Sequence, residues 1–375
     1  MRPYNINIFI MNIFSIFTDP FMDRRRVAVF GVIAVLVWVS TVMLLLQESR
    51  AGHRRVILIV IDGLRSDAID KNHWMQLPAF SYLIHQGAST LNARSDVHDT
   101  KALPNNVSII TGRPVYDTDS AHRYVLNSYT GQAIHDIRNK YIHSFFDVLY
   151  SNNYRNAFFA SKHWMGLFIK SYTAPRPPGS IFNRKKNPSR FQSFVVTEKD
   201  DAKTFEAFMI ELTNFDARCI FLHFSGVEAA GRASGWDVSS PESPYMKAVA
   251  QVDGYLGEIL ETVQKRRHLR GNVFLIVTSS HGGSPNPDAF QVPANFTVPF
   301  LVWGPGVARG TDLYALNPDR RRDPEEFLVP YNRDQQPIRN AEAGNLALHL
   351  LDLSPIPSSI INGLQSLRVS ASGDL

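Results

Sequence analysis

The stretch that decides the fold is Val56-Ile57-Leu58-Ile59-Val60-Ile61-Asp62-Gly63-Leu64-Arg65. Here six consecutive apolar residues run directly into a carboxylate and a glycine. A short apolar run rich in Val and Ile and bounded by a turn signal is typical of a strand buried on both faces of a parallel sheet. Ligands of such sheets bind beyond the carboxyl ends of the strands, where Asp62 would lie. The stretch alone leaves two interpretations of Asp62 open, a ligand of a bound cation or a turn-capping aspartate before glycine.

The composition is that of an ordinary globular protein. Of 375 residues, 44% are hydrophobic and 19% are charged, with a net charge of +5. This excludes a disordered chain and leaves room for one large α/β domain or two medium ones. The sequence contains no zinc-finger, helix-turn-helix or RNA-binding motif. Cys219 is the only cysteine, so an intrachain disulfide is excluded, and its apolar neighbours predict a buried structural thiol.

Residues 27–46 predict a transmembrane anchor. These twenty residues carry no charge, and at about 1.5 Å per residue they can cross a bilayer core of roughly 30 Å. Arginines precede the segment and no small-residue cleavage pattern follows it, so we expect an uncleaved signal anchor. The N-terminal segment 1–26 would be cytosolic and the main domain lumenal, periplasmic or extracellular.

Two features of the N-terminal region qualify this prediction. Arg50, Arg54 and Arg55 follow the segment and reduce the charge asymmetry that sets the orientation, although they leave the span itself unchanged. Residues 1–21 are rich in Ile, Phe and Asn without amphipathic order. We hypothesise that translation begins at Met22 and that residues 1–21 are a gene-model extension.

Strand and helix patterns alternate along the rest of the chain. Alternating strands and helices indicate βαβ units and a mostly parallel sheet flanked by helices on both faces. The sequence predicts strands at 157–161, 219–224, 273–278 and 299–303, and helices at 77–86, 204–212, 246–263 and 341–353. Residues 175–190, with four prolines and several cations, predict a surface loop.

One further helix is expected to begin near Pro104 and to end at Gly112. Proline fits the first turn of a helix, and glycine fits its C-terminal stop. The amides at such a helix N-terminus would point at an anion.

Five segments, taken in order, resemble the alkaline phosphatase superfamily, and most closely its type I phosphodiesterase and nucleotide pyrophosphatase branch. The resemblance implies an alkaline-phosphatase-like α/β fold as a single domain over residues 55–367, followed by a tail at 368–375. The segments are Ile61-Asp62-Gly63-Leu64-Arg65, Leu103-Pro104-Asn105-Asn106 through Gly112, Phe221-Leu222-His223-Phe224 through Arg232, Val277-Thr278-Ser279-Ser280-His281-Gly282-Gly283, and Pro299-Phe300-Leu301-Val302-Trp303-Gly304-Pro305-Gly306.

The resemblance also implies a chemistry. In this superfamily two divalent ions, usually zinc, clamp the attacking and leaving oxygens of an in-line displacement at phosphorus. A threonine or serine attacks and forms a covalent phosphoryl intermediate. Carboxylates and imidazoles hold the ions.

Carried onto this sequence, the resemblance leaves the site incomplete. The nucleophile position holds Ala102, which has no oxygen to attack with. The first metal site reads Asp62, Ser280 and His281, and the second reads Glu228, Arg232 and no histidine between residues 284 and 290. The remnant metal ligands are Asp62, Glu228 and His281.

This substitution pattern predicts that the two-metal mechanism does not operate. Losing a residue that only orients a metal ligand typically lowers metal affinity 10- to 100-fold. Losing residues that bind the ions directly, from both sites, should lower it further. We predict that Arg232 serves as the counterion of Asp62, because a guanidinium neutralises carboxylates but cannot activate water as zinc does.

A rescued activity would need replacement groups. Thr100 is the nearest substitute nucleophile, although a capping threonine fits the pattern as well. His98 is a substitute ligand or an exposed side chain. His223 is expected to be a core histidine. Trp164 and Met165, beside Lys162 and His163, are expected to pack without marking a site.

Three functions follow as hypotheses. The first is a membrane-anchored member of the superfamily that has lost catalysis and keeps a cleft for a phosphate-containing ligand, lined by Asn105, Arg232 and His281. The second is an active phosphoric ester hydrolase with one metal on a rearranged site and Thr100 as nucleophile. The third is a non-catalytic interaction module that uses the fold as a rigid exterior.

Overall fold

The computed structural model describes residues 32–40, 54–116, 118–173, 191–214, 217–286, 289 and 291–371. The chain divides into two units, residues 1–53 and residues 54–375. The second unit contains the sheet predicted from residues 56–61.

In the first unit, residues 32–40 are helical. The rest of the predicted anchor 27–46, like the segment 1–26, lies outside the described residues. Among the residues that the structure does describe, no helix is both long enough and apolar enough to cross a bilayer. The predicted surface loop 175–190 lies outside the described residues.

An eight-stranded sheet forms the centre of the second unit, with the strand order β4-β3-β5-β1-β6-β7-β2-β8. Strand β1 pairs in parallel with β5 on one side and with β6 on the other. The pairs β6–β7 and β2–β7 are antiparallel, so the sheet is mostly parallel, as predicted. The strands are Arg55–Ile61 (β1), Ala88–Arg94 (β2), Asn156–Ala160 (β3), Ser193–Val196 (β4), Cys219–Phe224 (β5), Val273–Thr278 (β6), Thr297–Trp303 (β7) and Thr311–Asp312 (β8).

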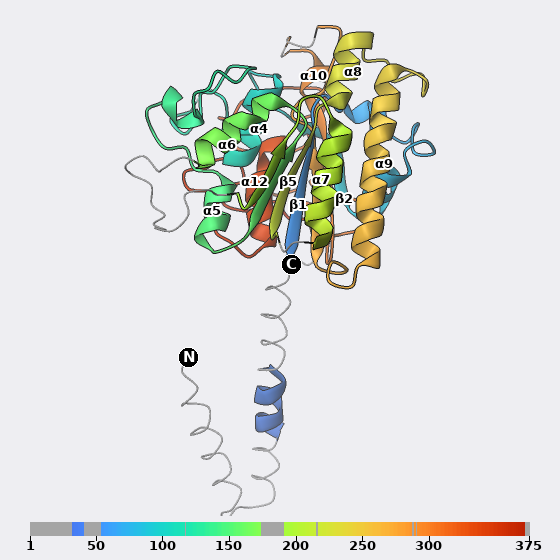
Figure 1. The fold of residues 1–375 in the computed structure, drawn as a ribbon. Helices are drawn as coiled ribbons and strands as arrows, with labels where there is room; N and C mark the ends of the chain where they lie inside the picture. The colour runs from blue at the N-terminus through green and yellow to red at the C-terminus, as the bar shows by residue number, and fades with distance from the viewer. Residues whose placement is uncertain are drawn as a thin grey trace, which may run out of the picture. The chain divides into compact units, whose positions relative to one another are not determined.

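Helices cover both faces of this sheet, as Figure 1 shows. Alternate residues of β1 enter two separate cores: Leu58 joins one with α4, α5 and α12, and Ile59 joins the other with α3, α7 and α9. The helices are Pro78–Gln86 (α3), Ala102–Thr111 (α4), Phe145–Ser151 (α5), Gly166–Thr173 (α6), Asp201–Asn214 (α7), Gly226–Ser234 (α8), Pro244–Lys265 (α9), Pro293–Phe296 (α10), Leu313–Leu316 (α11) and Ala343–Leu350 (α12).

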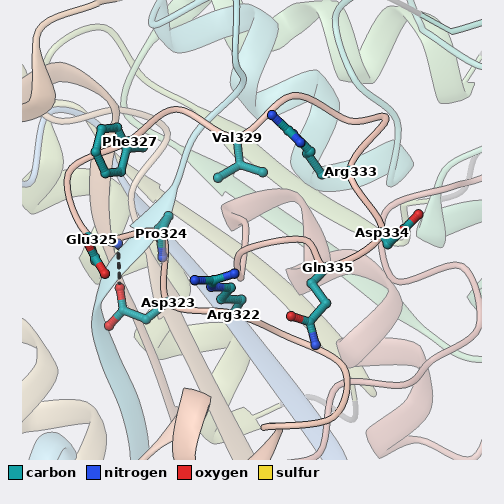
Figure 2. A pocket seen from close by; sticks show the side chains of 9 residues that line it. All are labelled: Arg322, Asp323, Pro324, Glu325, Phe327, Val329, Arg333, Asp334 and Gln335. Atoms are coloured by element: carbon teal, nitrogen blue, oxygen red, sulfur yellow. Dashed lines mark hydrogen bonds between the residues drawn. The ribbon is translucent and has the colours of Figure 1, made fainter.

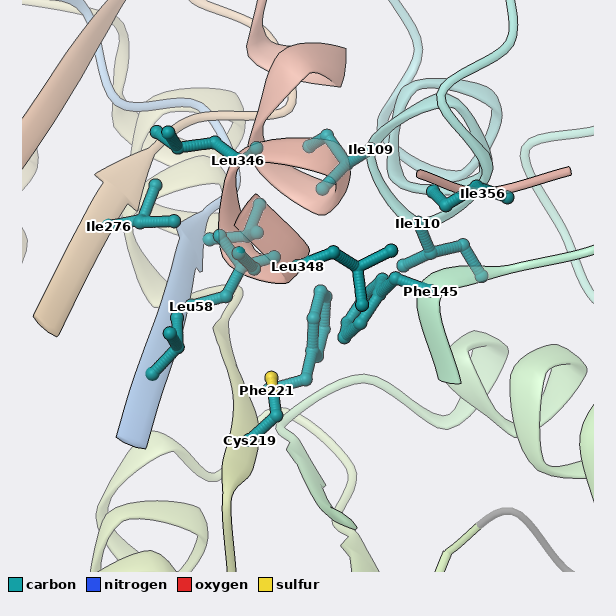
Figure 3. Packing of buried hydrophobic residues seen from close by; sticks show 14 of the residues in the cluster. Leu58, Ile109, Ile110, Phe145, Cys219, Phe221, Ile276, Leu346, Leu348 and Ile356 are labelled. Atoms are coloured by element: carbon teal, nitrogen blue, oxygen red, sulfur yellow. The ribbon is translucent and has the colours of Figure 1, made fainter. Parts of the chain in front are cut away.

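Cys219 lies in the first of these cores, beside Phe221 in Figure 3. The thiol is fully buried and free, and burial raises its pKa. The prediction of a structural cysteine is confirmed.

The predicted elements agree with the structure at the sheet centre and disagree at its edge. Strands β5 and β6 have the predicted bounds, and α4 begins two residues before Pro104 and ends at Gly112 with φ +61°. Strand β2 was not predicted, because its sequence is polar in the middle and carries an irregularity between Thr90 and Ala93. Val369, two residues beyond the predicted domain boundary at 367, is buried, and its carbonyl accepts a hydrogen bond from the amide of Ala308.

The topology places four neighbouring strand ends at one edge of the sheet. The parallel strands β3, β5, β1 and β6 end at residues 160, 224, 61 and 278. The residues that follow each end are therefore brought together, in the crevice where α/β sheets bind their ligands.

Candidate functional site

Asp62 lies directly beyond β1 and is fully buried. Its Oδ1 accepts hydrogen bonds from Asn106 Nδ2 at 3.0 Å and from Ser280 Oγ at 2.5 Å. Its Oδ2 lies 2.9 Å from His223 Nε2. Asp62 is thus the centre of a buried polar cluster built from β1, α4, β5 and the segment after β6, which is more than a turn cap requires.

Lys162, two residues beyond the end of β3, joins the two carboxylates of this cluster. Its Nζ lies 2.6 Å from Glu228 Oε2 and 3.6 Å from Asp62 Oδ2. The Lys162 side chain is 15% exposed, whereas those of Asp62 and Glu228 are 1% and 4% exposed. Burial opposes the charge on Lys162, but the two carboxylates outweigh it and raise the pKa of the ammonium.

Glu228, in the first turn of α8, has two further neighbours. Arg232 Nε donates to Glu228 Oε1 at 2.7 Å across one helical turn, and His281 Nε2 lies 3.6 Å from the same oxygen. Burial by itself would raise the pKa of the Glu228 carboxyl, but His281 and Lys162 lower it below the ordinary value. Burial likewise opposes the charge on Asp62, yet His223 and Lys162 hold its pKa below the ordinary value.

Backbone geometry brings the two carboxylates close together. Gly63 follows Asp62 with φ +76°, and a Cβ at this position would lie 2.8 Å from the Cα of Glu228. Only glycine allows both the left-handed conformation and this close approach. Asn340 Nδ2 binds the carbonyls of Ser279 and Ser280 and so fixes the segment that carries His281.

The residues present do not fit a two-zinc site. Ser280 donates a hydrogen bond where the superfamily has a ligand carboxylate, and Arg232 is a cation where it has a ligand imidazole. Lys162 and Arg232 already balance the charges of Asp62 and Glu228, which lowers the electrostatic gain from a bound metal ion. In the described ranges, no group of three or more His, Cys, Asp and Glu side chains is arranged to hold a metal ion.

The predicted remnant ligands Asp62, Glu228 and His281 do converge, but with Lys162 between the carboxylates. Arg232 was expected as the counterion of Asp62, whereas in the structure it forms an ion pair with Glu228. The partners of Asp62 include His223, which was expected to be a core histidine, and Lys162, for which no role was predicted. The sequence does hold one indication of this role: Lys162 follows the buried strand β3 by two residues and so lies at the edge of the sheet where ligands bind.

Asn105 has a structural role in the loop before α4. Its Nδ2 donates to the carbonyls of Asp99 and Lys101, and its Oδ1 accepts from the amide of Asp96. Its neighbour Asn106 is the asparagine that reaches Asp62. Asn106 and not Asn105 therefore contacts Asp62, and substrate binding by Asn105 stays a prediction.

The nucleophile position and its substitutes lie in the same loop. Ala102 is the first residue of α4 and is 1% exposed, and its carbonyl accepts a hydrogen bond from Asn106. Thr100 is buried in the preceding loop, and His98 is exposed. The roles of Thr100 as nucleophile and of His98 as ligand stay predictions.

A pocket of about 550 Å³ lies elsewhere, within the loop between residues 322 and 335. Figure 2 shows Phe327 and Arg333 on the rim and Arg322 inside. Arg94, which is fully buried, holds this loop through the carbonyls of Glu325 and Phe327. The pocket mixes two arginines with three acidic residues, so it favours neither anions nor cations, and no residue of the Asp62 cluster lines it.

Comparison with known families agrees with this geometry. Residues 56–341 match the family model described as type I phosphodiesterase / nucleotide pyrophosphatase. The chain belongs to this family. The match runs from β1 to the residues just before α12 and so includes every side chain of the Asp62 cluster. The resemblance found in the five sequence segments is confirmed.

Individual relatives are distant. The chain is 23% identical over 238 residues to GPI ethanolamine phosphate transferase 2 of Debaryomyces hansenii, a match that covers 63% of this chain and 24% of that protein. The chain thus matches about a quarter of the length of this curated relative.

Solved structures share the fold at low identity. Murine ectonucleotide pyrophosphatase/phosphodiesterase 5, in an inactive form in complex with AMP, is 15% identical with a TM-score of 0.55, over 84% of this chain and 99% of that one. An alkaline phosphatase superfamily protein from Vibrio parahaemolyticus is 13% identical with a TM-score of 0.52, over 84% and 70% of the two chains. These similarities establish an alkaline-phosphatase-like fold.

Replacing Lys162 by Met should lower the free energy of unfolding by about 3–5 kcal/mol, because it leaves a buried carboxylate without its cation. Lys203→Met is the matched control, since Lys203 pairs with Asp200 but is 76% exposed, and its loss should cost only about 0–1 kcal/mol. Urea denaturation of the purified variants measures both values. Equal losses in the two variants would show that Lys162 contributes no more than a surface ion pair.

Proposed function

We propose that this protein is a membrane-anchored, non-catalytic member of the phosphodiesterase family that does not perform two-metal hydrolysis of phosphoric esters. The observation that carries the proposal is the position of Lys162. Its ammonium lies between Asp62 and Glu228, the two carboxylates that would otherwise share the divalent cations. Two substitutions also support the absence of two-metal hydrolysis: Ala102 at the nucleophile position and Arg232 at a ligand position.

The chain's own residues can bind and orient but cannot complete the displacement. Arg232 carries a guanidinium that is 36% exposed beside the buried carboxylate of Glu228. A guanidinium can bind phosphate with two parallel hydrogen bonds. Formation of a phosphoryl intermediate also needs a deprotonated hydroxyl, and Ala102 provides none.

The purified protein should contain no stoichiometric zinc and should not hydrolyse bis(4-nitrophenyl) phosphate, even with added zinc. Elemental analysis and release of nitrophenolate measure the two properties. The matched control is a variant with Ala102→Thr, Arg232→His and Ser280→Asp, which restores three of the missing donors, together with Lys162→Ala, which removes the competing ammonium; it should bind more zinc than the unaltered chain.

The rival function, an active hydrolase with Thr100 as nucleophile, gives the opposite result in the same assay. It requires turnover by the unaltered chain and its loss in Thr100→Ala. Turnover that needs Thr100 would therefore overturn the proposal and establish the rearranged mechanism. Turnover that survives Thr100→Ala would reject both.

A phosphate-containing ligand is the second part of the proposal, and it rests on Arg232. His281 is buried and Asn105 is occupied by the loop before α4, so of the three predicted cleft residues Arg232 has the most accessible side chain. Its existing partner Glu228 makes the site electrically balanced, and we expect weak binding that salt reduces.

AMP should raise the melting temperature of the protein, and Arg232→Ala should abolish this increase. Arg155→Ala is a closely matched control, because Arg155 is also 36% exposed and also pairs with a buried glutamate, Glu211. Thermal unfolding with and without AMP is the measurement. An increase that persists in Arg232→Ala, or that is absent from the unaltered chain, would rule out this ligand site.

Membrane anchoring is supported by the helix at residues 32–40. Seven of its side chains are large, apolar and exposed, with Trp38 at 67% and Val35 at 60% exposed. Such a continuous apolar surface needs cover, and the uncharged segment 27–46 is long enough for a bilayer.

The full chain should stay in the membrane pellet after extraction with alkaline carbonate. Arginine at both Leu36 and Val37 should release it into the supernatant, because a charge at the centre of a span costs about 2.5–3.5 kcal/mol per residue on insertion scales. Leu364→Arg is the control, since Leu364 is 92% exposed in the second unit. Release of the unaltered chain would reject the anchor.

A further inference from the structure

The ammonium of Lys162 is surrounded by the groups that recognise a primary ammonium ion. It lies 2.6 Å from Glu228 Oε2, 3.6 Å from Asp62 Oδ2 and 4.7 Å from the centre of the Trp164 ring. Carboxylates accept the hydrogen bonds of an ammonium, and an aromatic face attracts its charge. These three side chains, here called the ammonium cage, belong to three separate segments of the chain.

The cage keeps unused hydrogen-bonding capacity. Lys162 donates a hydrogen bond to Glu228, whereas its Nζ lies 3.6 Å from Asp62 Oδ2, too far for a hydrogen bond, and that oxygen has His223 Nε2 at 2.9 Å as its nearer neighbour. An ammonium has three protons to donate. A cation not tethered to the main chain could move toward Asp62 and satisfy both carboxylates.

Charge balance favours a monovalent occupant. Asp62 and Glu228 supply two negative charges, and Arg232 neutralises one of them through Glu228. With the charge of Lys162 removed, a single positive charge restores neutrality, whereas a divalent ion would overcompensate. The described side chains also lack an arrangement of three or more ligands for a metal ion.

We propose that Asp62, Glu228 and Trp164 form a binding site for a primary ammonium group. In the unaltered chain the ammonium of Lys162 occupies this site, and when the Lys162 side chain is shortened the site accepts a primary alkylammonium ion. This inference rests on the proposed absence of catalytic metal at the same site and adds the chemical class of its occupant. Lys162 is then a positioning residue that holds the two carboxylates in place.

The test is chemical rescue of Lys162→Ala in the full chain. Truncation at Cβ removes the equivalent of propylammonium, so propylammonium chloride should recover more than half of the melting temperature lost in this variant. Tetramethylammonium chloride at the same ionic strength, which has no proton to donate, should recover little. Lys162→Met is the control, because its uncharged side chain still fills the cage and should show no propylammonium-specific recovery.

Three results would overturn the assignment: no recovery, equal recovery by both ammonium salts, or a larger increase with zinc chloride than with propylammonium. If Lys162→Ala is obtained only unfolded, the yield of refolding replaces the melting temperature, and equal yields in the two salts reject the site. These outcomes do not test the proposed function. Hydrolysis of phosphoric esters by the unaltered chain would contradict the proposed function, whether or not propylammonium rescues Lys162→Ala.

Discussion

The site depends on the neutralisation of two buried carboxylates by cations of the chain itself. Asp62 and Glu228 lie at the carboxyl ends of neighbouring strands, where an isolated charge would cost several kcal/mol. Lys162 contacts both, and Arg232 contacts Glu228. The hydrogen bonds that Asn106 and Ser280 donate to Asp62 stabilise its ionised form further. The formal charges of the two carboxylates are therefore balanced without any ion from solution.

The central sheet could be predicted because its signal is local. The six apolar residues of β1 alternate between two cores, and β5 and β6 have equally apolar sequences. The carboxylate after β1 could be placed at the functional edge on the same grounds. The antiparallel strand β2 could not be predicted in this way. Its pairing with β7 joins residues more than two hundred positions apart, and its own sequence is polar in the middle.

The composition of the site could be predicted only in part. Asp62, Glu228 and His281 were found through motifs, whereas Lys162 lies outside every motif and reaches the site through the order of strands, with β3 next to β5 and β5 next to β1. Asn105 and Asn106 lie about 100° apart around the axis of α4, so which of them faces Asp62 depends on the rotational orientation of the helix, which the local sequence does not determine. Long-range pairing and helix phase are properties that local patterns do not determine.

The survival of Asp62 and Glu228 beside lost ligands has a physical explanation that needs no metal. Once Lys162 and Arg232 pair with these carboxylates, removing either carboxylate leaves an excess positive charge beside the buried Lys162, at a cost of up to about 3–5 kcal/mol. That loss is a large fraction of the 5–15 kcal/mol that stabilises a typical domain. Stability alone can thus preserve acidic residues at former ligand positions. In a member of this family, the carboxylates are therefore weak evidence for catalysis, and the identity of their cationic partner is the stronger evidence.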